Sequence, residues 1–225
     1  MNNRVSLIAG STGFLGSKVL NYLDKENQKI YCLSRRKNEI NTVNAEEIII
    51  DFDNIENLNL PKIDHVYLCL GYELRAWELI SMPKRKKGPF YKVDYEYTLN
   101  IAKKAEEVGA TSISLVSAVG ANKNSESFYL KTKGDLEEEI KKLKFETINI
   151  FQPGHLAGRI NWQKKKSDPR LDVFVFEIGS LFLDPFLVSR LKKFRSINAN
   201  KLANFIVKST INENLGINQY QYSDF

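Results

Sequence analysis

The stretch Val5–Gly16, VSLIAGSTGFLG, carries the clearest signal of the fold in this chain. A short apolar run ends in the loop Gly10-Ser11-Thr12-Gly13-Phe14-Leu15-Gly16, and apolar residues then recur at helical spacing as far as Leu23. Glycines allow positive φ and let a backbone approach a diphosphate closely, while a helix start offers N–H groups and a positive dipole end. The segment therefore predicts a strand, a dinucleotide-binding turn and a helix. A tight turn without a ligand is the alternative.

Strand-like and helix-like segments alternate from this loop to about residue 150. The expected helices are Phe14–Leu23, Tyr91–Val108 and Phe128–Leu143, with a polar loop before the second that runs through Pro89. The other expected strands are Lys29–Leu33, Glu47–Ile50, His65–Leu70, Thr111–Ser117 and Thr147–Phe151. Apolar strands joined by helical, right-handed crossovers predict an α/β fold with a doubly wound parallel sheet.

The last third of the chain is less regular. It holds an apolar stretch from Val173 to Val188, a helical segment from about Asn200 to Ile211, and a strand-like segment near Ile217–Tyr222. A length of 225 residues suits one α/β domain. We expect a single domain over residues 1–225, in which residues from about 155 onward form a small cap on the substrate side. The apolar stretch favours core over a subunit contact, and both monomer and homodimer stay open.

Composition is that of a soluble globular protein, with 43% hydrophobic and 27% charged residues. No apolar run is long enough to span a bilayer, and the N-terminus lacks a signal-peptide pattern, so we expect a cytoplasmic protein. Cys32 and Cys69 lie in strand-like runs and are expected to be reduced core thiols. Two cysteines and two histidines, far apart in the sequence, predict no metal site.

The net charge of +6 includes the basic runs Lys84–Lys87 and Lys164–Lys166. Neither run has interleaved aromatic residues or a nucleic-acid-binding motif beside it. We interpret them as solvated loops, and expect a small-molecule substrate without a nucleic-acid or membrane partner. A basic protein also attracts a polyanionic cofactor.

The residues after the second strand bear on which dinucleotide is bound. An NAD site usually has an acidic residue there for the ribose hydroxyl, whereas this chain has Ser34-Arg35-Arg36. Because guanidinium groups match a phosphate, NADP(H) is favoured. Asp51, just past the third strand, suits either an adenine contact or a capping role.

Tyr129 and Lys133 are four residues apart on an expected helix, so they share a face. Ser117 ends the fifth strand, whereas Ser114 within it is expected to be structural. A carbonyl that accepts hydride needs a proton, and an adjacent ammonium would lower the pKa of a tyrosine that donates it. The spacing alone is weak evidence, but its position after the fifth strand strengthens it. We predict Ser117, Tyr129 and Lys133 as catalytic.

Six segments in order resemble the small atypical short-chain dehydrogenase/reductases, close to the Tat-interacting oxidoreductase subfamily. They are GSTGFLG (Gly10–Gly16), CLSRR (Cys32–Arg36), LCLG (Leu68–Gly71), KVDYEYTLN (Lys92–Asn100), LVSAVGANKNSESFYLKTKGDLEE (Leu115–Glu138) and FQPGHLAGR (Phe151–Arg159). The resemblance implies a Rossmann-like fold, NADP(H) binding, the same catalytic triad, a lysine contact with the nicotinamide ribose, and a Pro153-Gly154 turn beside the nicotinamide. The cofactor-binding residues expected are Gly10, Ser11, Thr12, Gly13, Phe14, Leu15, Gly16, Ser34, Arg35, Arg36, Asp51, Phe52, Leu70, Gly71, Lys133 and Pro153.

Two departures from the family pattern stand out. Tyr72-Glu73 replaces a usual Thr-Thr pair, and the loop from Tyr72 to Gly88 is longer than usual and carries a basic run. Gln152 replaces the arginine before Pro153-Gly154. The first departure bears on the substrate and the second on contacts near the nicotinamide.

Three functions follow from these patterns. The leading hypothesis is an NADP(H)-dependent oxidoreductase that reduces a small carbonyl-type substrate, with a tyrosine as proton donor. The alternative is an NADPH-binding redox-sensing or regulatory protein with little turnover. Nucleotide-sugar epimerisation ranks third, because the chain is short for a nucleotide-sugar subdomain.

Overall fold

The computed structural model describes residues 4–26, 28–38, 42–158, 187, 189–211 and 214–225. The apolar stretch from Val173 to Val188 lies outside these ranges except for Leu187. The basic run Lys164–Lys166 lies wholly outside them. No helix within the described ranges has the length and apolar character needed to cross a membrane.

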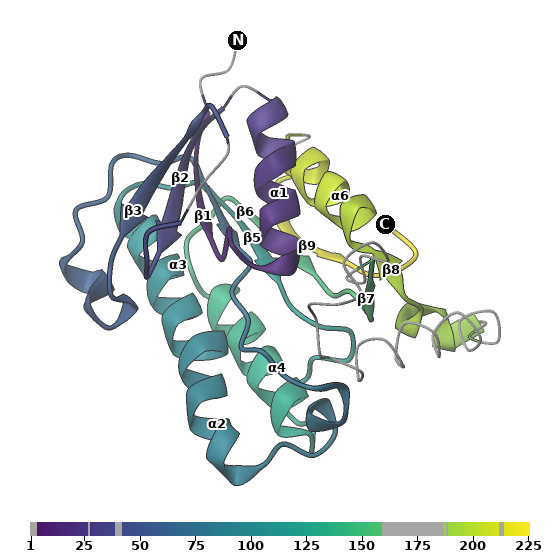
Figure 1. The fold of residues 1–225 in the computed structure, drawn as a ribbon. Helices are drawn as coiled ribbons and strands as arrows, with labels where there is room; N and C mark the ends of the chain where they lie inside the picture. Colours follow the sequence, from purple (N-terminus) through teal and green to yellow (C-terminus); the bar gives the residue numbers. More distant parts are fainter. Residues whose placement is uncertain (1–3, 27, 39–41, 159–186, 188, 212–213) are drawn as a thin grey trace, which may run out of the picture.

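One parallel sheet of seven strands forms the centre of the molecule (Figure 1). Its strand order is β3-β2-β1-β4-β5-β6-β9. The strands are β1 Val5–Ala9, β2 Lys29–Ser34, β3 Ala45–Ile49, β4 His65–Leu68, β5 Ser112–Val116, β6 Thr147–Phe151 and β9 Gly216–Tyr220. The expected doubly wound parallel sheet is confirmed.

Helices cover both faces of this sheet. Helices α1 (Phe14–Lys25) and α6 (Ala199–Ile211) lie on one face, while α3 (Thr98–Glu107) and α4 (Phe128–Ile140) lie on the other (Figure 1). Helix α2 (Lys84–Tyr91) extends α3 away from the sheet through a π-helical segment, η3 (Lys92–Tyr97). The short elements are η1 Phe52–Asn57, η2 Ala76–Leu79, η6 Ser189–Phe194, and a two-stranded sheet of β7 Leu156–Ala157 and β8 Ile197–Asn198.

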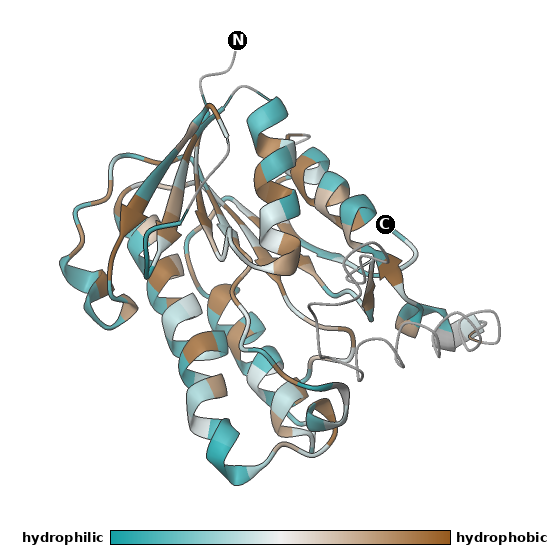
Figure 2. Cartoon of the chain, in the orientation of Figure 1, coloured by the Kyte–Doolittle hydropathy of each residue, from teal (hydrophilic) through white to brown (hydrophobic). Residues whose placement is uncertain are grey.

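The core has two halves, one for each face of the sheet. Successive residues of a strand point to opposite faces, so Leu7 packs with the α3–α4 side and Ile8 packs with the α1–α6 side. Figure 2 shows that apolar and polar residues alternate along the helices, as in helices with one buried face. Both faces of the strands are thus buried, which explains why the sequence shows near-continuous apolar runs.

The strand order reverses at β1, which lies between β2 and β4. In open α/β sheets, ligands bind beyond the carboxyl ends of the strands at such a switch point. Two glycines let the chain turn here. Gly10 has φ of +90° and lies so close to β4 that a Cβ would be 2.5 Å from the Cys69 carbonyl oxygen. A Cβ on Gly16 would overlap the Gly10 carbonyl oxygen.

The prediction of a polar loop through Pro89 is wrong, because α2 begins at Lys84 and contains Pro89. Tertiary contacts override the local Gly-Pro signal: Phe90 is fully buried, and Lys86 pairs with Glu78 at 2.7 Å. The other expected helices and strands of the first 151 residues are confirmed, with shifts of a few residues at their ends.

The C-terminal segments complete the sheet, and they also approach the carboxyl ends of its strands. Helix α6 packs on α1, and β9 adds an edge strand parallel to β6. The short strand β7 pairs with β8 just after the Pro153-Gly154 turn. The substrate-side cap expected from residue 155 onward stays a prediction, since residues 159–186 lie outside the described part.

Gly16→Ala should lower the free energy of unfolding by about 1–3 kcal/mol, because the added methyl group overlaps backbone that cannot move freely. Chemical denaturation measures the change. Gly88→Ala is the matched control, since a Cβ there meets nothing within 4 Å. Equal stability of the two variants would contradict the close packing of α1 on the glycine loop.

Candidate active site

A cavity of about 570 Å³ opens at the carboxyl ends of β1, β4, β5 and β6. It is lined by four groups of residues that are far apart in the sequence. They are Thr12–Leu15, Cys69–Leu74 with Leu79 and Asp94, Val116–Ala118 with Tyr129 and Lys133, and Pro153–Leu156. The glycine loop and the predicted catalytic residues therefore face one space.

The start of α1 forms one wall of this cavity. Gly13 is the N-cap residue of α1, no side chain caps the helix, and its first turn carries no acidic residue. The positive end of the helix dipole thus faces the cavity, and no carboxylate in the first turn of α1 offsets it. A Cβ at Gly13 would be 3.2 Å from the Gly10 carbonyl oxygen, so the loop is closely wound. This cradle fits the pyrophosphate of a dinucleotide.

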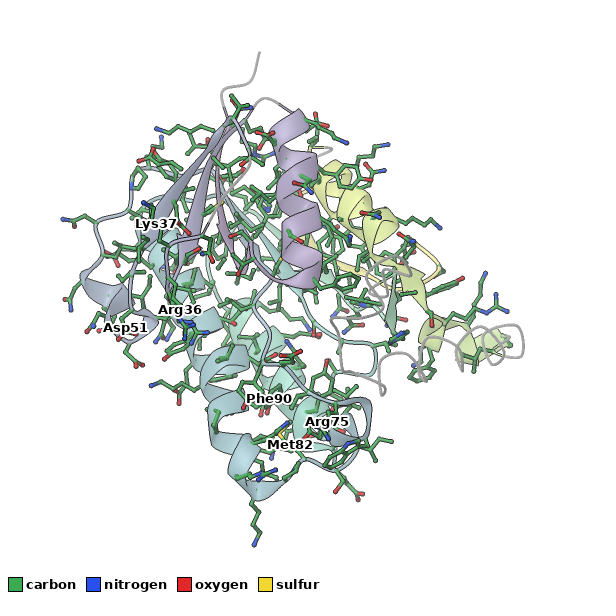
Figure 3. All side chains as sticks on the ribbon, in the orientation of Figure 1. Arg36, Lys37, Asp51, Arg75, Met82 and Phe90 are labelled. Carbon is green, nitrogen blue, oxygen red and sulfur yellow. The ribbon has the colours of Figure 1, made fainter. Side chains whose placement is uncertain are left out.

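The predicted phosphate-binding arginines lie beyond the ends of β2 and β3, outside the cavity lining. The Arg35 guanidinium carbon is 6.0 Å from the centre of the Phe52 ring, and both arginines are exposed. Figure 3 shows Arg36 and Lys37 after β2, with Asp51 nearby after β3. Asp51 accepts a hydrogen bond from the Asp53 amide at 3.2 Å and so caps η1, one of its two expected roles.

Tyr129 and Lys133 lie together on α4, as the spacing predicts, and Lys133 has a partner that the sequence reasoning missed. The Lys133 ammonium is 2.7 Å from Asp94 Oδ1, and both side chains are buried. The Tyr72 amide donates to Asp94 Oδ2 at 2.6 Å. Asp94 comes from the π-helical segment η3, and π-helical turns within helices are frequent at functional sites.

Burial raises the pKa of the Tyr129 phenol, Lys133 lowers it by less, and Asp94 raises it further. The result is a raised pKa, opposite in direction to the lowering expected from Lys133 alone. Burial by itself would lower the pKa of Lys133, but Asp94 and Tyr129 outweigh burial and raise it. The ammonium therefore stays protonated, and Asp94 offsets much of the charge that Tyr129 would otherwise feel.

Ser117 lines the cavity, but its hydroxyl donates a hydrogen bond to Glu137 Oε1. The Gln152 amide nitrogen donates to both oxygens of Glu137, at 2.9 and 3.0 Å. Gln221 in turn donates to Gln152 Oε1 at 2.8 Å. Burial raises the pKa of Glu137, although the bonds from Gln152 and Ser117 oppose that change.

Sequence reasoning missed Glu137 as well as Asp94. Glu137 lies four residues beyond Lys133, so it extends the face of α4 that carries Tyr129 and Lys133. That spacing was a usable signal. Asp94 lies within the segment Lys92–Asn100, but its contact with Lys133 exists only after η3 packs on α4.

The predicted cofactor residues fall into three groups. Those that line the cavity are Thr12, Gly13, Phe14, Leu15, Leu70, Gly71, Lys133 and Pro153. Gly10, Ser11 and Gly16 belong to the same loop but are not among the lining residues. Ser34, Arg35, Arg36, Asp51 and Phe52 lie along the neighbouring strand ends.

Both cysteines are free thiols, as expected; Cys32 lies in the core, whereas Cys69 is half-buried. Cys69 borders the cavity, but burial raises its pKa to about 12. Its thiolate is therefore scarce at neutral pH, which makes it a poor nucleophile.

Comparisons with known proteins agree with this geometry. A family model described as "NAD dependent epimerase/dehydratase family" matches residues 6–139. The mitochondrial protein FMP52 of Lodderomyces elongisporus is 34% identical over 172 residues, which cover 70% of this chain and 69% of that protein. HTATIP2 of Rattus norvegicus is 30% identical over 167 residues, which cover 69% of this chain and 64% of that protein.

A solved structure of human epimerase family protein SDR39U1 with NADPH has a TM-score of 0.66 to this chain. The match covers 96% of this chain and 74% of the human one, at 15% sequence identity. At that identity the likeness supports the fold alone.

Asp94→Asn should destabilise the protein by about 3–5 kcal/mol, because it leaves the buried Lys133 ammonium without its countercharge. Thermal or chemical unfolding measures the loss. Asp53→Asn is the control, since Asp53 and Lys92 form an ion pair of similar length, 2.8 Å, on the surface. That control should cost about 1 kcal/mol or less. Similar losses in both variants would refute a buried pair at the site.

Proposed function

Because the chain belongs to the NAD dependent epimerase/dehydratase family, an NAD(P)-binding family of the short-chain dehydrogenase/reductase type, we propose that it is an NADP(H)-dependent oxidoreductase that reduces a small carbonyl-type substrate. The matches to FMP52 and HTATIP2 confirm the resemblance to the atypical members of this group. The observation that carries the proposal is the single cavity that holds the start of α1, Tyr129 and Lys133.

A bound nicotinamide dinucleotide would supply the hydride. Backbone N–H groups at the start of α1 would bind its pyrophosphate, since Thr12–Leu15 line the cavity at the positive end of the helix dipole. Lys133 would bind the ribose next to the reacting carbon.

Tyr129 would donate the proton to the substrate oxygen. A raised pKa keeps its phenol protonated at neutral pH, which suits a proton donor. Lys133 would lower the free energy of the phenolate that is left behind, because its ammonium stays charged. Asp94 acts on Tyr129 through Lys133 and is therefore a positioning residue.

Ser117 would orient the substrate oxygen, and the protonation state of Glu137 decides how. When Glu137 is ionised, the Ser117 hydroxyl donates to the carboxylate and can only accept a bond from the cavity. When Glu137 is protonated, it can donate to Ser117, which frees the hydroxyl proton for a carbonyl oxygen. The raised pKa of Glu137 shifts the balance toward the second state.

The choice of NADP(H) over NAD(H) rests on the arginines after β2. Arg35 and Arg36 are exposed beside Asp51 and Phe52, where the adenosine end of a dinucleotide bound at the switch point would lie. The phosphate that NADP carries on that ribose would lie near two guanidinium groups, and the end of β2 has no acidic side chain.

The alternative is an NADPH-binding regulatory protein with little turnover. It is favoured by the same electrostatics, because Asp94 offsets the Lys133 charge and Glu137 holds the Ser117 hydroxyl. We also propose a cytoplasmic location for this protein. The names of its FMP52 relatives, by contrast, carry the word mitochondrial.

Wild-type protein should bind NADPH at least about tenfold more tightly than NADH, and Arg35→Ala combined with Arg36→Ala should remove the difference. Isothermal titration calorimetry measures both affinities. Arg85→Ala, an exposed arginine on α2, is the control and should leave the preference intact. Equal affinity of the wild type for the two cofactors would overturn the argument from the arginines.

Tyr129→Phe should lower turnover of a carbonyl panel by about 10²–10⁴-fold while leaving NADPH affinity almost unchanged, because it removes only the proton donor. Tyr95→Phe is the control, since Tyr95 stacks on Tyr91 and is not a cavity residue. Full activity in Tyr129→Phe would exclude the proton-donor role. NADPH binding with no turnover of any carbonyl would favour the regulatory function.

A further inference from the structure

The surface around the start of α2, at the end of this helix farthest from the sheet, carries exposed apolar side chains beside basic residues. We define the η2–α2 surface as Arg75, Trp77, Leu79, Ile80, Lys84 and Arg85. Trp77 is 51% exposed and Ile80 is 84% exposed, while Leu79 is exposed at 37%. Figure 3 locates this region by Arg75 and Met82, at the lower end of the molecule. Large apolar groups gathered in this way mark interaction sites.

The residues next to these exposed apolar side chains are hydrogen-bonded or buried. Glu78 points inward, where it accepts hydrogen bonds from the Arg75 amide at 2.8 Å and from Lys86 Nζ at 2.7 Å. Met82 and Phe90 are buried beneath the segment. Because these hydrogen bonds hold η2 in place, the exposure of Trp77 within it and of Ile80 just after it is a built feature of the loop.

A further hydrogen bond joins η2 to α4, the helix that carries Tyr129 and Lys133. The Ser127 hydroxyl, at the N-cap of α4, donates to the Leu79 carbonyl oxygen at 3.0 Å. Leu79 also lines the cavity. The η2–α2 surface is thus continuous with the rim of the candidate active site.

The charge of this surface is strongly positive. Residues 72–91 contain five lysines and arginines and two glutamates, one of which, Glu78, is already paired with Lys86. The first turn of α2 is Lys84-Arg85-Lys86, with no acidic residue. Cations at a helix N-terminus are unfavourable next to the positive dipole end, so an anionic counterpart would gain from this arrangement.

We propose that the η2–α2 surface docks the protein peripherally on an anionic lipid bilayer. Ile80 and Trp77 enter the boundary between headgroups and acyl chains, where tryptophan is favoured, while Lys84 and Arg85 contact lipid phosphates. A nucleic acid would match the cations but would leave Ile80 without a partner. No membrane partner is expected from the sequence, because the basic run lacks interleaved aromatic residues. In the fold, η2 contributes Trp77 to the same surface.

Vesicle sedimentation of the full chain tests this proposal. The protein should bind phosphatidylcholine vesicles that contain about a third phosphatidylserine, bind pure phosphatidylcholine weakly, and dissociate as salt rises. In a Trp162→Phe background, Trp77 is the sole tryptophan, so its emission should shift to the blue on binding and be quenched by brominated lipid. Binding of all vesicles alike, or of none, would overturn the proposal.

Two variants separate the apolar and the charged contributions. Lys84→Glu with Arg85→Glu should weaken binding by more than about tenfold, and Ile80→Ser by about fivefold. The controls are Lys201→Glu with Lys208→Glu on α6, and Val43→Ser, because these residues are exposed elsewhere on the molecule.

Unchanged binding in the η2–α2 variants would refute the assignment. So would equal binding to heparin and to anionic vesicles with no blue shift of Trp77, since that result points to an acidic macromolecule. None of these measurements depends on cofactor binding or turnover, so the result stands apart from the proposed oxidoreductase activity.

Discussion

The close packing of α1 on the glycine loop Gly10–Gly16 positions the other parts of the candidate site. Gly10 turns with positive φ against the Cys69 carbonyl, and Gly16 lies against Gly10 itself. This contact fixes where α1 begins and directs its N-terminus at the crevice between β1 and β4. Because parallel strands end at one edge of the sheet, Ser117 and Pro153 reach the same crevice from β5 and β6.

Most of the fold could be predicted from the sequence, because a parallel sheet buried on both faces needs apolar strands and leaves a clear alternation with amphipathic helices. Strands β1 and β6 have the bounds that their apolar runs predict. The prediction failed at α2, where Gly88-Pro89 indicates a break. Burial of Phe90 and the pairing of Lys86 with Glu78 stabilise the helix through contacts that local sequence does not reveal.

The catalytic candidates could be predicted in position but not in electrostatic state. Tyr129 and Lys133 share a face of α4 by spacing alone, whereas Asp94 meets Lys133 only through the packing of η3 on that helix. This pair raises the pKa of Lys133, and burial raises that of Tyr129. Glu137 is held by the neutral donors Gln152 and Ser117, and burial raises its pKa too. Tyr129, Lys133 and Glu137 therefore hold their protons more strongly than the free side chains do, which suits the proton donation proposed for this site.

A crystal structure of the full chain grown with NADPH would show whether the crevice at the start of α1 holds the dinucleotide. We expect a diphosphate in contact with the backbone of Thr12–Leu15, the nicotinamide ribose near Lys133, and the remaining phosphate beside Arg35 and Arg36. A dinucleotide bound elsewhere, or a crevice at the start of α1 that stays empty at saturating NADPH, would contradict this expectation.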